Sequence, residues 1–113
     1  MPFINSSTGE TIALETRDPI ASNIGKNLTV LTLVDVKLQC ETTGTPMPSV
    51  AWYKDDKKID GESSNVLIVS DGNIVDGGKY TCTATNVKGE VSEDSYIKFV
   101  GEHLFSSLFN ALH

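Results

Sequence analysis

The sequence predicts an all-β protein, because three of its stretches alternate apolar and polar residues with the period of a β-strand. In the clearest stretch, 79–85, Tyr80, Cys82 and Ala84 share one face. The other face is polar and consists of Lys79, Thr81, Thr83 and Thr85. Threonine favours strands and keeps an outer face wettable. Turn-forming residues at 86–89 then indicate a hairpin to a following strand.

Two further strands carry the rest of the predicted core. Cys40 ends the stretch 34–40, where it shares an apolar face with Val34, Val36 and Leu38. Trp52 lies between the two cysteines, on the stretch 49–54. A cysteine in the middle of a strand needs a partner, and Cys40 is the only other cysteine besides Cys82. We expect the three inward faces to meet around a Cys40–Cys82 bridge, with the indole packed against it.

Two extended motifs resemble those of the immunoglobulin superfamily, and within it the intermediate set, or I-set. The pattern Asp-x-Gly-x-Tyr-x-Cys-x-Ala-x-Asn-x-x-Gly is met by Asp76, Gly78, Tyr80, Cys82, Ala84, Asn86 and Gly89. The pattern Gly-x-Pro-x-Pro-x-Val-x-Trp-x-Lys-Asp is met by Gly44, Pro46, Pro48, Val50, Trp52, Lys54 and Asp55. The order Cys, Trp, Tyr-x-Cys is also the hallmark of this superfamily.

The resemblance implies an immunoglobulin-like sandwich of two antiparallel sheets. It assigns Cys40 and Cys82 to the inter-sheet disulfide and implies a core signature of Trp52, Tyr80, Leu38, Asp76, Gly78 and Ala84. The hydroxyl of Tyr80 should bond back to the backbone near the preceding corner. Because little chain separates Gly61 from the apolar stretch 65–70, the strand usually labelled D should be short or missing. I-set sequences usually carry an apolar residue where this chain has Gly72, and we expect Ile74 to fill that space.

A chain of 113 residues has room for one domain and two flanks. We expect a flexible N-terminal flank at residues 1–18, the I-set domain at 19–100 and a C-terminal tail at 101–113. In the tail, apolar residues recur at helical spacing: Leu104, Phe105, Leu108, Phe109 and Leu112. The tail therefore has the pattern of a short amphipathic helix, although a helix of this length is only marginally stable by itself in water.

Several functional classes are disfavoured. The formal net charge of −6 argues against nucleic acid, whose binding depends on clustered lysine and arginine. No stretch approaches the roughly 20 apolar residues of a membrane span, so we expect no direct membrane insertion. The N-terminus also lacks the basic and apolar regions of a signal peptide.

The sequence offers no candidate catalytic residues, metal ligands or cofactor site. Both cysteines are assigned to the core, and the two histidines, His103 and His113, lie in the tail. No zinc-ligand spacing occurs, and Asp76-Gly77-Gly78 precedes a strand instead of the helix that a phosphate loop needs. The acidic residues at 55–62 lack the ladder of a calcium loop. We expect a protein that is not an enzyme.

What remains is protein binding. The outward face of the sheet that contains Trp52 and Cys82 should present Tyr53, Thr81, Thr83, Thr85, Tyr96 and Lys98. Tyrosine can anchor an interface through its large ring and polar tip. An ordinary solvated sheet is the alternative reading of this face. Asn5 and Asn27 head triplets that fit the N-glycosylation pattern, although such triplets also arise by chance.

The resemblance implies a non-catalytic interaction module of an extracellular adhesion, matrix or receptor protein, either secreted or part of an ectodomain. The paired cysteines favour that compartment, since disulfides persist where conditions are oxidising. Expected partners are other proteins, whether identical copies or neighbouring immunoglobulin modules. The alternative is an intracellular module of the titin or palladin sort, which would act as a structural spacer or cytoskeletal binder.

Overall fold

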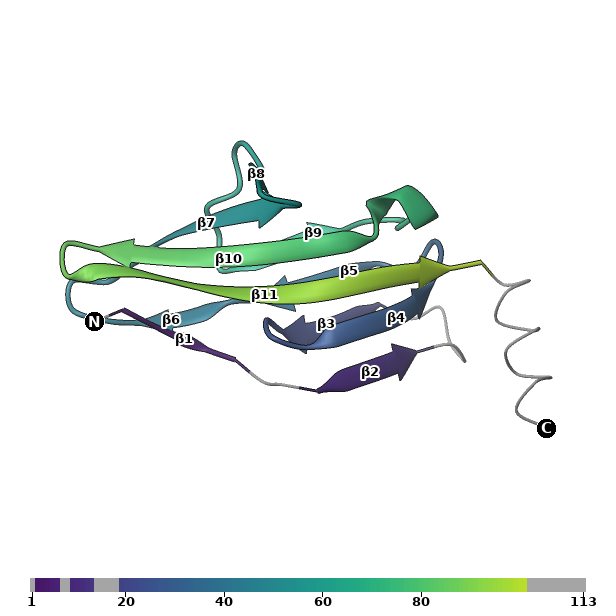
Figure 1. Ribbon diagram of the computed structural model, residues 1–113, viewed down its shortest axis with the longest axis horizontal. Helices are drawn as coiled ribbons and strands as arrows, with labels where there is room; N and C mark the ends of the chain where they lie inside the picture. The colour runs from purple at the N-terminus through teal and green to yellow at the C-terminus, as the bar shows by residue number, and fades with distance from the viewer. Residues whose placement is uncertain (1, 7–8, 14–18, 102–113) are drawn as a thin grey trace.

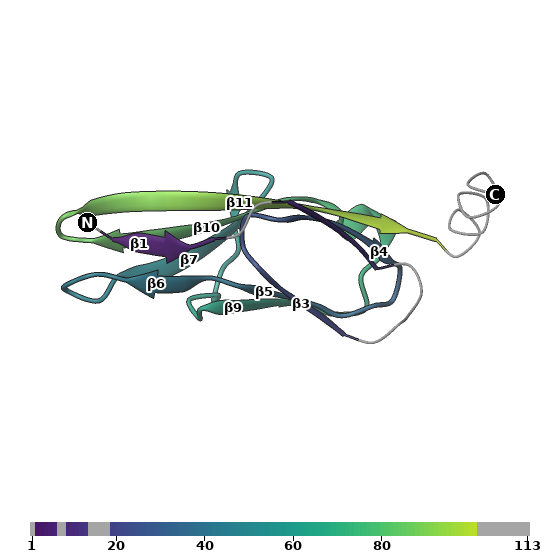
Figure 2. The same cartoon turned by 90° about the horizontal axis from the view of Figure 1, so that it is seen from below.

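The computed structural model describes residues 2–6, 9–13 and 19–101, and these residues form two packed β-sheets and a small strand pair. Figures 1 and 2 show the two layers from perpendicular directions. The front sheet has the order β2 (Glu10–Ala13), β4 (Asn27–Leu31), β11 (Gly89–Val100), β10 (Gly78–Asn86), β7 (Ser49–Lys54) and β8 (Lys57–Lys58). The rear sheet has the order β3 (Ile20–Asn23), β5 (Val36–Gln39) and β9 (Val66–Val69). The strand pair joins β1 (Phe3–Asn5) to β6 (Glu41–Thr43), and Ile74–Asp76 form the 3₁₀ helix η1.

The centre of the front sheet is the long hairpin of β10 and β11. The two strands pair antiparallel from Gly78 opposite Ile97 to Asn86 opposite Gly89. The turn follows from local chemistry: Asn86 Oδ1 accepts a hydrogen bond from the Lys88 N–H, and Gly89 adopts φ of 152°. On the other side of β10, Cys82 lies opposite Trp52 of β7. The alternation in the sequence therefore predicts this part of the sheet correctly.

A reversal at Gly25 carries the chain from the rear sheet to the front sheet. Before it β3 runs parallel to β5, whereas after it β4 runs parallel to β11. The arrows of β3 and β4 accordingly point in opposite directions in Figure 1. Gly25 has φ of 110°, a conformation open to glycine, and its N–H donates to Ser95 Oγ over 2.8 Å. This bond fixes the reversal to the middle of β11.

Between β8 and β9 the described chain contains no strand, so strand D is missing as expected. A short crossing at residues 59–65 replaces it. The indole Nε1–H of Trp52 donates to the carbonyl of Ser64 over 2.7 Å, which ties the crossing to the core. The crossing is thus fixed to the front sheet by a side-chain hydrogen bond.

The N-terminal flank differs from expectation. We expected residues 1–18 to be flexible, but β1 pairs antiparallel with β6, and β2 pairs parallel with β4. Strand pairing with the rest of the chain, which local sequence does not reveal, accounts for the difference. The helix expected within 102–113 lies outside the described residues. No helix in the described ranges is long and apolar enough to cross a lipid bilayer.

Phe99, and not Ile74, fills the space above Gly72. A Cβ built on Gly72 would lie 2.1 Å from Phe99 Cε1, so the ring occupies the place where the family usually has a side chain. Phe99 is 3% exposed, whereas Ile74 of η1 is 58% exposed. The expectation that Ile74 fills the gap is wrong, because the larger residue reaches across from the last strand of the front sheet.

Candidate functional site

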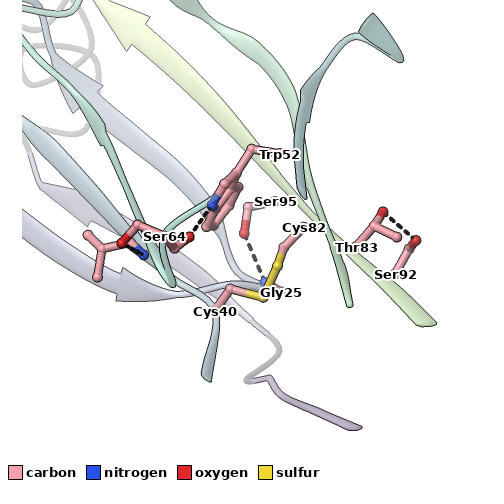
Figure 3. Close-up of a disulfide and its surroundings, with 9 residues drawn as sticks. Gly25, Cys40, Trp52, Ser64, Cys82, Thr83, Ser92 and Ser95 are labelled. Carbon is pink, nitrogen blue, oxygen red and sulfur yellow. Dashed lines mark hydrogen bonds between the residues drawn. A yellow bond between two sulfur atoms is a disulfide. The ribbon is translucent and has the colours of Figure 1, made fainter. Parts of the chain in front are cut away.

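The scaffold of the candidate site is the disulfide core drawn in Figure 3. Cys40, directly after β5, and Cys82, in β10, form a disulfide with their Cα atoms 6.5 Å apart, which confirms the predicted pairing. Both cysteines and Trp52 are fully buried, as are Leu38 and Ala84. The bridge joins the rear sheet to the centre of the front sheet. It therefore holds the outer face of the front sheet on a rigid support.

A second fixed point is the corner before β10. The buried Tyr80 donates its hydroxyl hydrogen to the backbone carbonyl of Asp76. Burial raises the pKa of Tyr80 to about 12, with further contributions from the carboxylates of Asp76 and Asp55. Asp76 also helps to cap the N-terminal end of η1, because its Oδ2 accepts a hydrogen bond from the N–H of the N-cap residue Asn73 over 2.8 Å. This corner sets where β10 begins.

Asp55 connects the turn after β7 to the start of β10. Its Oδ1 accepts from the Lys79 N–H over 3.0 Å, and its Oδ2 contacts Lys54 Nζ at 3.3 Å. The backbone hydrogen bond from Lys79, followed by the bond from Lys54, lowers the pKa of the Asp55 carboxyl. Gly78 has φ of 148°, and a Cβ there would lie 2.7 Å from Asp55 Oδ1. The glycine of the motif thus makes room for this carboxylate.

The threonines of the candidate face are partnered within the sheet. Thr81 Oγ1 donates to Asp94 Oδ1 over 2.6 Å, and the Thr83 hydroxyl bonds with that of Ser92 over 2.8 Å. Thr85 Oγ1 reaches Glu90 Oε2 at 3.3 Å. Thr83 is only 7% exposed, so it offers a partner little surface, contrary to our expectation for the face. These β11 partners follow from the strand register, which places residues 94, 92 and 90 opposite the three threonines, and alternation along a single strand does not reveal them.

The aromatic part of this face is a tyrosine patch, which we define as Tyr53, Lys79, Tyr96 and Lys98. Tyr96 is 53% exposed and lies opposite Lys79 in the β10–β11 register. Tyr53 of β7 is half-buried, and Lys98 is exposed. Lys79 Nζ forms an ion pair of 2.8 Å with Asp56, which raises the lysine pKa. The two tyrosines of the patch supply aromatic surface of the kind that is enriched at protein interfaces.

The two candidate glycosylation sites lie at the surface. Asn5 in β1 and Asn27 at the start of β4 are both exposed. Asn5 Nδ2 approaches Glu41 Oε2 at 3.5 Å, a weak contact that a glycan could displace. Attachment of a glycan at either position remains a prediction.

Segments of several much longer proteins are similar to this chain. A segment of hemicentin-1 from Mus musculus is 42% identical over 76 residues, which covers 60% of this chain and 1% of hemicentin-1. Tyrosine-protein kinase-like otk from Drosophila ananassae is 31% identical over 109 residues, or 91% of this chain and 10% of that protein. The chain therefore spans a small fraction of these relatives.

Solved structures share the fold. The N-terminal four immunoglobulin domains of Dscam1 match with a TM-score of 0.63 and 29% identity, over 73% of this chain and 21% of that one. The titin fragment A168169 matches with a TM-score of 0.64 and 25% identity, over 88% of this chain and 48% of that one. The model of the immunoglobulin I-set domain matches residues 19–99. With the disulfide, the buried tryptophan and the tyrosine corner in place, the chain belongs to the immunoglobulin I-set family.

Proposed function

We propose that this chain is a non-catalytic protein-binding module of an extracellular adhesion, matrix or receptor protein, and that it binds through the tyrosine patch. The observation that carries the proposal is Tyr96, which is 53% exposed on a sheet where the threonine hydroxyls are already bonded to neighbours. A rigid aromatic side chain gives a large contact area at a low cost in conformational entropy. Tyrosine is accordingly enriched among residues that dominate binding energy.

Three features support an extracellular setting. The chain contains a fully buried disulfide, and such bonds persist mainly in oxidising compartments. The acceptor residues of the two glycosylation triplets, Asn5 and Asn27, are exposed. The similarity to hemicentin-1, and to protein sidekick-2 from Gallus gallus at 37% identity over 90 residues, points the same way through the family resemblance.

The binding face is tested by substituting its tyrosines. We would immobilise a panel of purified immunoglobulin-module ectodomains, with this chain among them, and measure binding by surface plasmon resonance. Tyr96→Ala should weaken any specific interaction by at least about tenfold, the effect typical of an interface anchor. Tyr53→Ala should have a smaller effect because its side chain is half-buried.

The matched control is Val87→Ala, which trims an apolar side chain that is 88% exposed at the turn between β10 and β11, away from the patch. Thermal midpoints of all variants should agree, because none of the three side chains belongs to the buried core. Binding that Tyr96→Ala and Tyr53→Ala leave unchanged would remove this face from consideration.

The compartment is tested by an intact-mass measurement on protein from its native source. The extracellular proposal expects loss of the thiol hydrogens of Cys40 and Cys82, with glycan on Asn5 or Asn27. Free thiols and bare asparagines would instead support the second candidate, an intracellular structural or cytoskeletal module. The similarity to titin domains is the observation that favours this alternative.

A further inference from the structure

Strand β9 is an open edge of the rear sheet. The order β3-β5-β9 places it last, and within the described residues it pairs with β5 alone. The missing strand D would have covered its far side. The backbone groups that face away from β5 are therefore available to another strand.

The hydrogen bonds show which residues present these groups. The Cys40 N–H donates to the Asn65 carbonyl over 2.7 Å, so odd-numbered residues of this segment face β5. The Asp71 N–H, which donates to Asp35 Oδ1, has the same parity. The backbone groups of Val66, Ile68 and Ser70 consequently point outward. The Val66 N–H already bonds to Ser64 Oγ over 3.2 Å, which leaves the groups of Ile68 and Ser70 to an added strand.

The sequence of this edge lacks the usual protection. Native edge strands are commonly guarded by a charge, a proline or a bulge. No charged residue or proline occurs from 63 to 70, and the strand itself reads Val-Leu-Ile-Val. The Ile68 side chain is also 54% exposed. An uncharged strand with strong β-propensity at an open edge is suited to pairing with a second strand.

We propose that β9 pairs antiparallel with β9 of a second copy of this chain, with the twofold axis at Ile68. Outward-facing residues must oppose each other, so Ile68 lies opposite Ile68 and Val66 opposite Ser70. In this register Asp71 lies opposite Asn65, and no like charges face each other across the pairing. The aliphatic side chains of the two Ile68 residues form a favourable cross-strand pair. The neutral edge therefore fits its own copy.

The association should be weak and dependent on salt. One strand pair of this length buries far less than the roughly 1,200 Å² of a standard stable interface. Each copy also carries a net charge of −6, and salt screens the repulsion between copies. We would follow sedimentation velocity of the whole chain from about 10 µM to about 1 mM, at low and high salt. A monomer–dimer equilibrium that strengthens with salt is expected.

Ile68→Lys should weaken dimerisation at least about tenfold, because it places two ammonium groups opposite each other at the axis. Val87→Lys is the matched control, since it makes the same change in charge at an apolar side chain that is 88% exposed and distant from β9. That control should leave the equilibrium unchanged. Amide hydrogen exchange on the unsubstituted protein gives an independent readout: protection of Ile68 should rise with concentration.

A chain that stays monomeric at about 1 mM, with Ile68 exchange independent of concentration, would overturn the proposal. So would a dimer that Ile68→Lys does not weaken while that variant keeps its thermal midpoint. Tyr96→Ala should leave the dimer intact, because the tyrosine patch lies on the other sheet. Failure of the edge pairing and failure of the tyrosine patch are therefore distinguishable.

Discussion

The two sheets of the sandwich are held in different ways. The front sheet is built on the long β10–β11 hairpin. On its outer face, three threonines of β10 form side-chain hydrogen bonds with Asp94, Ser92 and Glu90 of β11. The rear sheet has three short strands and an open edge at β9. It is connected to the front sheet by the disulfide, by the apolar core that both sheets share and, just after β9, by the contact of Phe99 with Gly72. Strand pairing and a shared apolar core stabilise both sheets, and the rear sheet, which has fewer and shorter strands, depends more on its tertiary links to the front sheet.

Removing the disulfide should cause the largest loss of stability, and the loss should differ between the two sheets. The bridge spans a sequence separation of 42, for which loop-closure entropy gives about 4 kcal/mol at room temperature. Small domains have net stabilities of about 5–15 kcal/mol, so the Cys40→Ala/Cys82→Ala variant should lose a large part of its free energy of unfolding. Denaturant unfolding measures the loss. Hydrogen exchange should show greater deprotection in β5 and β9 than in β10 and β11.

The reverse order of deprotection would contradict the view that the rear sheet depends on this link. A midpoint that hardly moves would show that the bridge adds little to stability. Reduction of the unsubstituted protein serves as the companion experiment, because it breaks the same bond without changing the side-chain volume at either position.

Gly72→Ala should have an intermediate effect. The new Cβ would meet the Phe99 ring at 2.1–2.2 Å, so the ring must move and the sheets must shift locally. Overpacking of this kind costs about 1–3 kcal/mol. Thermal and denaturant unfolding measure the change. Gly101→Ala is the matched control and should be neutral, since nothing lies within 4 Å of its added Cβ.

A second substitution sharpens this test. In the presence of Phe99→Leu, which shortens the side chain, Gly72→Ala should cost less than it does alone, and the difference measures the coupling between the two sheets at this point. Equal costs in both backgrounds would show that the strain arises elsewhere.

The smallest expected effect concerns Asp55, which acts within the front sheet alone. Its pKa is lowered in the folded state from 3.8, so the carboxylate contributes stability that is present above that value and lost as the pH falls through the folded pKa. Carboxyl ¹³C NMR should show Asp55 titrating below pH 3.8. Because the carboxylate is exposed to solvent, screening keeps the effect on unfolding small. A midpoint at or above 3.8 would exclude the bond to the Lys79 amide in solution.

The centre of the molecule could be predicted from the sequence because its signals are local and periodic. Alternation identified the strands with Cys40, Trp52 and Cys82, and the number of cysteines left one pairing. The tyrosine corner followed from the spacing of Tyr80 and Cys82 within the family motif. In each case a short window contains both the residue and the pattern that determines its place.

Other features depend on neighbours distant in the chain. Phe3–Asn5 and Glu10–Ala13 form strands only because β6 and β4 offer edges to pair with. Thr83 is buried because Ala51 and Ser92 flank it across the sheet. The fit of Phe99 over Gly72 is a matter of volume between two sheets. No periodicity in the sequence encodes these distances, so they could not be predicted from pattern alone.

The bond between the indole of Trp52 and the carbonyl of Ser64 has a practical consequence. Trp52 is the only tryptophan of the chain, it is fully buried, and it lies opposite Cys82 in the strand register. Its fluorescence is therefore a native optical probe of the point where the two layers meet. Any event that separates the sheets or opens the 59–65 crossing should change its emission without the need for an attached dye.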